Sequence, residues 1–95
     1  MDSPHPGHRE RVDGNAAGGL LLELFGQDMT GARATCAHCG HEAVIADAVA
    51  EMDAAGVILL CRGCGHTLVT YLRAEGRRTL SIGGLASLQW SAGEA

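Results

Sequence analysis

Two Cys-x-x-Cys motifs constrain this chain more than any other feature. Cys36 and Cys39 form the first pair, Cys61 and Cys64 form the second, and 21 residues separate them. Two residues between thiols allow one tight turn to aim both sulfurs at a single ion, and paired motifs at this spacing are typical of a four-thiolate zinc site. A glycine follows each pair and suits the left-handed backbone that such a turn needs. The spacing therefore predicts that the four cysteines bind one Zn²⁺.

A chain of 95 residues forms one small domain whose core is marginal on apolar burial alone. Its aromatic residues are limited to Phe25, Tyr71 and Trp90, so a metal that staples the fold is the expected remedy. Every cysteine belongs to one of the two pairs, which leaves none for a disulfide framework. We find neither an apolar N-terminal leader pattern nor an apolar run of membrane-spanning length. These features favour a cytoplasmic protein with reduced thiols.

The charge balance argues against nucleic acid as a partner. The chain has a formal net charge of −4, with seven basic and 11 acidic residues, and a zinc ion held by four thiolates makes the folded chain more negative. Affinity for phosphate backbones comes largely from clustered positive charge. The arginines that lie close together in sequence, Arg73, Arg77 and Arg78, are accounted for by a hairpin turn.

The N-terminal part of the domain is expected to hold its one helix. Residues 1–13 are polar and rich in proline and glycine, which predicts a disordered tail. A helix is expected over residues 16–25, with Asn15 as its N-cap and Gly26 as its end. Two glycines weaken this helix, so we expect it to form only by docking on the rest of the domain.

The remaining residues predict a mostly β fold. The expected strands are the second half of 43–52, then 57–61, 67–73 and 78–82. Residues 27–35 are expected to form a connector, and an apolar tail piece is expected over 85–90. The prediction is a small, metal-stapled domain over residues 14–90, mostly β, with two cysteine knuckles on antiparallel hairpins and one N-terminal helix. Residues 91–95 are expected to form a frayed end.

Three histidines lie beside the cysteines, namely His38, His41 and His66. One of them can replace a cysteine and give a site of three thiolates and one imidazole. We expect instead that they surround the ligands, donating hydrogen bonds to thiolates or pointing into water.

Other chemistry for the same residues is less well supported. Iron in a rubredoxin-like site uses similar knuckles, but this chain lacks an aromatic-rich core. A catalytic zinc needs an open ligand position, whereas four cysteines close the site, so we expect no enzyme activity. The carboxylates that follow the first pair, Glu42, Asp47 and Glu51, are interpreted as a solvated face.

The paired knuckles resemble those of the zinc-ribbon superfamily. The fuller pattern consists of Asp13-Gly-Asn-Ala16, Glu23-Leu-Phe-Gly26, Asp28-Met-Thr30, the two Cys-x-x-Cys pairs and Gly83-Gly-Leu85. Over roughly residues 12–88 it resembles short bacterial proteins that are classed as a domain of unknown function. The resemblance implies a compact, zinc-ribbon-like fold with the four cysteines as ligands, and it implies no activity.

These observations favour a non-catalytic accessory or adaptor protein that binds another protein and uses zinc structurally. The alternatives are a regulator that contacts nucleic acid and an iron electron carrier. Two flanks, one before the first cysteine pair and one after the second, carry apolar side chains. These side chains are candidates for a partner surface or for self-association. These side chains are Leu21, Leu24, Phe25, Leu85, Leu88 and Trp90. Both flanks can instead pack on each other and close the core.

Overall fold

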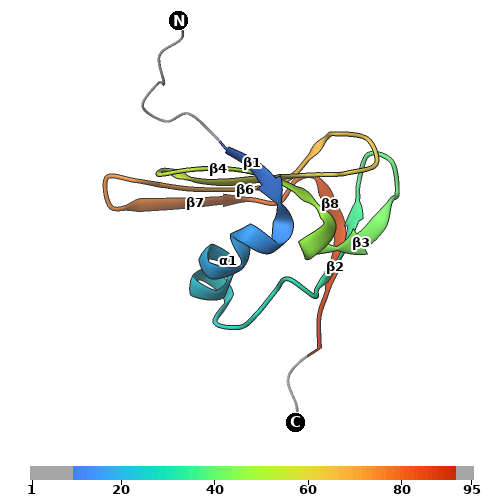
Figure 1. Cartoon of the computed structure of the whole chain (residues 1–95), viewed down its shortest axis with the longest axis horizontal. Coiled ribbons are helices and arrows are strands. Elements are labelled where there is room, and N and C mark those ends of the chain that lie inside the picture. Colours follow the sequence, from blue (N-terminus) through green and yellow to red (C-terminus); the bar gives the residue numbers. More distant parts are fainter. Residues whose placement is uncertain (1–9, 92–95) are drawn as a thin grey trace, which may run out of the picture.

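The computed structural model describes residues 10–91, which form eight strands, one α-helix and two short 3₁₀ turns (Figure 1). In chain order the elements are β1 (Glu10–Asp13), η1 (Gly14–Ala17), α1 (Gly18–Phe25), β2 (Arg33–Cys36), β3 (Glu42–Val44), η2 (Ile45–Asp47), β4 (Val49–Asp53), β5 (Gly56–Leu60), β6 (Thr67–Ala74), β7 (Arg77–Ser81) and β8 (Leu85–Gln89). Within these residues, no helix is both long enough and apolar enough to cross a membrane.

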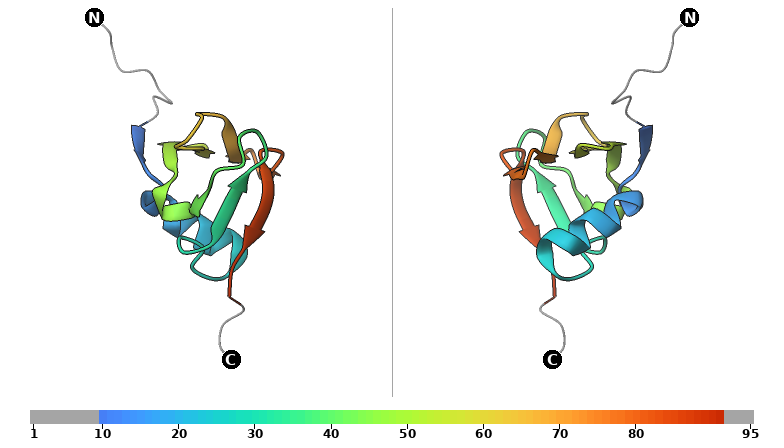
Figure 2. Two further views of the ribbon diagram at one scale, coloured as in Figure 1. Left: turned by 90° about the vertical axis from the view of Figure 1, so that its right-hand side faces the viewer. Right: turned by 90° about the vertical axis from the view of Figure 1, so that its left-hand side faces the viewer.

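The strands make two antiparallel sheets. The larger sheet has the order β1-β4-β5-β6-β7, and the smaller has the order β3-β2-β8. In Figure 1 the larger sheet is seen almost edge-on, with α1 beneath it and the smaller sheet to the right. Figure 2 shows the smaller sheet more nearly face-on, with β2 between β3 and β8. Strands from both sheets therefore enclose the same interior.

The core lies between α1 and the inner faces of the two sheets. Its largest fully buried side chains are Tyr71, Met29, Leu59 and Val57. Val57 and Leu59 are two positions apart on β5, so both side chains point to the same face, the one that α1 covers. The predicted small, mostly β domain with one helix is confirmed.

The first strand corrects the expectation of a tail that runs through residue 13. Residues 10–13 form β1, which pairs with β4 through partners such as Arg11 with Glu51 and Val12 with Ala50. An ion pair of 2.7 Å joins the Arg11 guanidinium to the Glu51 carboxylate. A strand held by backbone pairing needs few apolar residues of its own, which explains why composition misses it. The rest of the predicted tail, residues 1–9, lies outside the described residues.

The helix is shorter than expected at its start. A 3₁₀ turn occupies Gly14–Ala17 and α1 begins at Gly18, so Asn15 is not the N-cap; the residue in that position, Ala17, has no side-chain cap. The predicted end is confirmed: Gly26 has φ of 77°, and its N–H donates to the Leu22 carbonyl at 2.7 Å.

Four strands of the larger sheet, β4 to β7, follow the predicted segments closely, whereas β1 and the smaller sheet are new. Residues 27–35, expected as a connector, contain most of β2, and the expected apolar tail piece contains β8. These two strands pair from Arg33 with Gln89 to Cys36 with Leu85, with an irregularity after Thr35. The C-terminal segment is therefore part of the fold and places one edge of the first cysteine turn.

Candidate metal site

Each cysteine pair lies in the turn of a β-hairpin. The first turn connects β2 to β3, and the second connects β5 to β6. The Cys36 N–H donates to the His41 carbonyl at 2.9 Å, and the Cys61 N–H donates to the His66 carbonyl at 2.8 Å. The two turns lie side by side in Figures 1 and 2. The predicted pair of knuckles on antiparallel hairpins is therefore present in the structure, one knuckle on each sheet.

Two glycines allow the knuckles to close. Gly40 has φ of 79° and Gly65 has φ of 84°, a left-handed conformation that costs other residues energy. Their N–H groups donate to the carbonyls of Cys36 and Cys61 at 2.9 and 2.8 Å. The glycine after each pair is thus required by the turn, as the sequence indicates.

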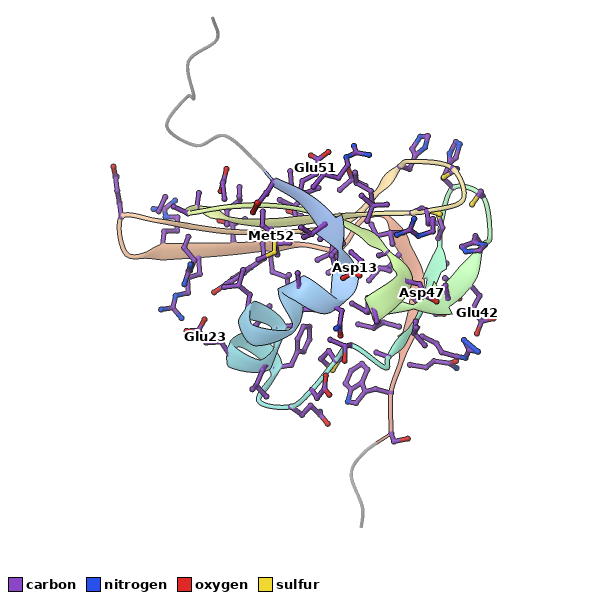
Figure 3. All side chains as sticks on the ribbon, in the orientation of Figure 1. Asp13, Glu23, Glu42, Asp47, Glu51 and Met52 are labelled. Atoms are coloured by element: carbon purple, nitrogen blue, oxygen red, sulfur yellow. The ribbon has the colours of Figure 1, made fainter. Side chains whose placement is uncertain are left out.

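The four sulfur atoms meet where the turns adjoin. The Sγ atoms of Cys36 and Cys64 are 3.7 Å apart, as are those of Cys39 and Cys61, and all four lie within 4.8 Å of one another. Figure 3 shows sulfur atoms gathered at these two turns. A tetrahedral ion with Zn–S bonds of about 2.3 Å separates its ligand sulfurs by roughly 3.8 Å. The spacing of the sulfurs therefore fits one metal ion.

The four candidate ligands are half enclosed by the fold. Cys36 and Cys61, the first cysteine of each pair, are buried, whereas Cys39 and Cys64 are exposed. A bound ion would therefore have two ligands anchored in the core and two facing the solvent. The burial pattern repeats in both knuckles, and so do their backbone hydrogen bonds.

Backbone N–H groups point at the sulfurs and favour their charged form. The N–H of His38 lies 3.3 Å from the Cys36 sulfur, that of His41 lies 3.4 Å from Cys39, and that of Gly63 lies 3.3 Å from Cys61. Hydrogen bonds donated to a thiolate stabilise it relative to the thiol. Each knuckle thus supplies part of the positive potential that a thiolate ligand needs.

The thiols of this cluster influence one another. The backbone amide of Cys39, as the main cause, lowers the pKa of the Cys36 thiol to about 7. At Cys64 the amide of His66 lowers the pKa, but burial and the three neighbouring thiols outweigh it and raise that pKa to about 12. The amide of His41, as the largest influence, and the Cys64 thiol lower the pKa of Cys39, but burial and the thiols of Cys61 and Cys36 outweigh them and raise it. Four thiolates this close need a cation between them, which a metal ion provides.

The three histidines lie in two different environments. The rings of His38 and His66 are stacked, with centroids 3.5 Å apart and planes inclined by 15°, and the His66 Nδ1 lies 3.7 Å from the Cys64 sulfur. The His41 ring lies beside Gly63, since a Cβ added to that glycine would lie 3.2 Å from the ring. None of the three comes within the group formed by the four sulfurs.

The carboxylates near the first knuckle do not converge on the sulfurs. Figure 3 shows Glu42 and Asp47 on the side of β3 and Glu51 on the larger sheet. The Glu42 carboxylate lies 3.9 Å from the Arg33 guanidinium, and the Glu51 carboxylate forms an ion pair with Arg11. The backbone carbonyl of Asp47 accepts a hydrogen bond of 2.7 Å from Arg62, which ties the second knuckle to η2. These contacts are typical of a solvated, ion-paired surface.

The candidate partner residues lie mostly against the core. Leu21 is buried at 2% exposure, which corrects its assignment to a surface: it lies on the face of α1 that packs against the sheet. Leu24, Phe25, Leu85 and Leu88 are half-buried and pack against the same core.

Trp90 differs from the other five candidates. Its side chain is 46% exposed, and its ring lies 6.2 Å from that of Phe25 between centroids. The two flanks thus meet each other, with one large aromatic face left open.

Residues of the longer sequence pattern have structural roles that their spacing does not reveal. Asp28 accepts hydrogen bonds from the Thr30 N–H at 2.9 Å and from the Thr30 hydroxyl at 2.6 Å, and Met29 between them is buried. Gly84 lies so close to β6 that an added Cβ would lie 1.8 Å from the Thr67 carbonyl oxygen. The pattern therefore reports on turns and close backbone contacts around the core.

The fold and the site define a small, mostly β domain with one helix and a four-cysteine cluster that can hold a metal ion. The chain belongs to the Family of unknown function (DUF6510), whose model matches residues 7–93. The resemblance to a family of unknown function is confirmed, while the zinc-ribbon assignment stays a prediction. No curated protein and no solved structure matches the chain.

Proposed function

We propose that this protein is a non-catalytic accessory or adaptor protein of zinc-ribbon type, in which one structural Zn²⁺ is held by Cys36, Cys39, Cys61 and Cys64. The observation that carries the proposal is the 3.7 Å spacing of sulfurs from two hairpins, which fits a tetrahedral ion. Four protein ligands leave no position for water or substrate, so the metal would stabilise the fold rather than activate a reaction. Reduced thiols as ligands fit a cytoplasmic location.

The adaptor hypothesis implies that the partner is another protein. Half-exposed apolar groups remain where the two flanks meet, with Trp90 at 46% exposure beside Phe25. Large exposed aromatic side chains are enriched at protein–protein interfaces. The acidic net charge of −4 disfavours nucleic acid. An ion pair of 3.8 Å joins the Arg73 guanidinium to the Glu23 carboxylate. One of the three neighbouring arginines therefore already has an acidic partner within the chain.

Analysis of the metal tests the zinc assignment. Protein purified from its native cell should contain one zinc per chain and should lack visible absorption, because Zn²⁺ has a filled d shell. A red protein with one iron per chain would instead support the rubredoxin-like electron carrier, which uses the same four thiolates. A metal content well below one per chain after anaerobic purification would overturn the assignment of a metal site.

Matched variants test the partner. A protein that co-purifies with the wild type should be lost with Trp90→Ala and retained with Leu22→Ala, since Leu22 is similarly exposed, at 50%. Sedimentation of the purified chain tells a second copy from a different protein. Salt-sensitive binding to nucleic acid, unaffected by Trp90→Ala, would overturn the adaptor reading in favour of a regulator.

A further inference from the structure

A second group of metal-binding atoms lies on the outer side of the cysteine cluster. The ring nitrogens of His38 and His66 and the sulfur of Cys64 offer ligand atoms within 4.8 Å of one another, and all three side chains are exposed. The three residues come from both knuckles, so the fold and not the local sequence brings them together. We propose that they form a second metal site, one that shares the Cys64 thiolate with the four-cysteine site; this inference rests on that first site being loaded.

One distance within this group, that between Cys64 and His66, already fits a metal ion of the same class. The Cys64 sulfur and the His66 Nδ1 are 3.7 Å apart. A tetrahedral ion with bonds of about 2.3 Å to sulfur and about 2.05 Å to nitrogen separates the two ligand atoms by roughly 3.6 Å. Imidazole and thiolate together select borderline-soft divalent ions such as Zn²⁺ and Co²⁺.

A thiolate already bound to zinc can serve as a ligand a second time. Zinc with four thiolates carries a net charge of −2, so a further cation at its solvent side is electrostatically favoured. Cys64 is exposed, which leaves the outer side of its sulfur accessible to an incoming ion, whereas Cys36 and Cys61 are buried. The second ion therefore belongs at Cys64 and not at the inner sulfurs.

The stacked rings must open for this ion to bind. Parallel rings with centroids 3.5 Å apart direct their nitrogen lone pairs alongside each other, whereas a bound ion lies near the plane of each ring. Both histidines are exposed, so a rotation of their side chains meets little resistance. The stack holds the two rings within reach of one ion and leaves further ligand positions to water, which makes this metal exchangeable.

The two knuckles provide an internal comparison. His66 and His41 hold equivalent positions, two residues after the last cysteine of each pair, but His38 of the first knuckle is matched by Gly63 of the second. His66 therefore stacks on a histidine, while His41 lies against a glycine. One side of the pseudo-symmetric site has two imidazoles and the other has one. His41→Ala is thus a matched control that removes a histidine without touching the proposed site.

Zinc titration followed by native mass spectrometry and calorimetry tests the proposal. The titrated protein is a variant with His5→Ala and His8→Ala, which remove the two histidines of the N-terminal segment as competing ligands. We expect a first, tight zinc and a second, weaker one. His38→Ala should weaken the second step by at least about tenfold and leave the first unchanged, while His41→Ala should change neither step. The ring nitrogens of His38 and His66 should shift in NMR only with the second equivalent.

The outcomes separate this proposal from the function proposed above. One tight zinc with no second binding step overturns the second site alone. A second step that His38→Ala and His41→Ala weaken equally also overturns it, because the ligands would then lie elsewhere. Absence of the first, thiolate-bound zinc, seen as missing charge-transfer absorption after loading with Co²⁺, overturns the structural metal site itself.

Discussion

Cys36 and Cys64 lie 28 positions apart in the sequence, and their Sγ atoms lie 3.7 Å apart. Cys36 is the last residue of β2 in the smaller sheet, whereas Cys64 follows β5 of the larger one. A metal ion that joins these two sulfurs therefore clamps one sheet to the other. The clamp would add to the apolar contacts between the sheets, since Cys36 and Cys61 belong to the same buried cluster as residues of both sheets.

Removal of the metal should unfold the domain. Structural zinc contributes about 10 kcal/mol or more in small zinc domains, which is comparable to the entire stability expected of a chain this size. Treatment with a strong chelator should collapse the amide dispersion in NMR, and added zinc should restore it. Cys61→Ser, which removes a buried ligand, should have the same effect as the chelator.

His66→Ala serves as the control for that experiment. Its ring lies beside the exposed Cys64 sulfur and outside the group of four sulfurs, so the variant should stay folded with zinc bound. A chelated wild-type protein that kept its dispersed spectrum would show that the two sheets hold together without the clamp.

Gly84→Ala should destabilise the domain because the chain there lies against β6. An added Cβ would lie 1.8 Å from the Thr67 carbonyl oxygen and 2.7 Å from the Leu68 Cα, both backbone atoms that cannot move aside freely. Forced overpacking of this kind costs about 1–3 kcal/mol. Gly83→Ala is the matched control, since nothing lies within 4 Å of its added Cβ. Urea unfolding of the zinc-loaded proteins should separate the two variants, and equal midpoints would contradict this prediction.

Neighbouring leucines of α1 should differ sharply in their contribution to stability. Leu21 is 2% exposed and Leu22 is 50% exposed. Leu21→Ala should lower the free energy of unfolding by about 2–5 kcal/mol, whereas Leu22→Ala should change it by no more than about 0.5 kcal/mol. Thermal unfolding of both variants checks the orientation of the helix. A larger loss for Leu22→Ala would mean that α1 packs through a different face.

Strands β4 to β7 of the larger sheet could be predicted because they carry their own signals. Val57 and Leu59 alternate along β5, a glycine at 56 opens it, and the second cysteine pair ends it. The four-cysteine cluster was predictable for a similar reason: its sulfurs are set by spacing within two short turns, and Gly40 and Gly65 mark where each turn closes. Signals of this kind lie within a few neighbouring residues, so they can be recognised without knowledge of the rest of the chain.

The smaller sheet and β1 could not be predicted because their signals are non-local. β8 is held by pairing with β2, more than 40 positions earlier, as in the contact between Leu88 and Ala34. β1 has Val12 as its only strongly apolar residue and is held by pairing with β4. The stacked pair of His38 and His66 likewise depends on how the two knuckles face each other. A spacing rule that recognises each knuckle separately gives no information about that arrangement.

The turn after α1 should reveal itself in the titration of Asp28. The Thr30 hydroxyl, as the main cause, and then the Thr30 N–H donate to its carboxylate and hold the pKa of Asp28 below the ordinary value of 3.8. Because the pKa is lowered in the folded state, ionised Asp28 contributes stability above pH 3.8, and that contribution is lost as the pH falls through the folded value.

Carboxyl chemical shifts in NMR follow Asp28 in the zinc-loaded protein from neutral pH down to the pH at which protonation of the thiolates releases the metal. Thr30→Val removes the stronger of the two donors and should raise the pKa of Asp28 toward 3.8, without reaching it, because the backbone N–H remains. Thr35→Val is the control, since that hydroxyl accepts from Ser87 at 3.1 Å where β2 pairs with β8. If Asp28 titrates at its ordinary value in the wild type, or if both valine variants shift it equally, the turn does not have the hydrogen bonds described here.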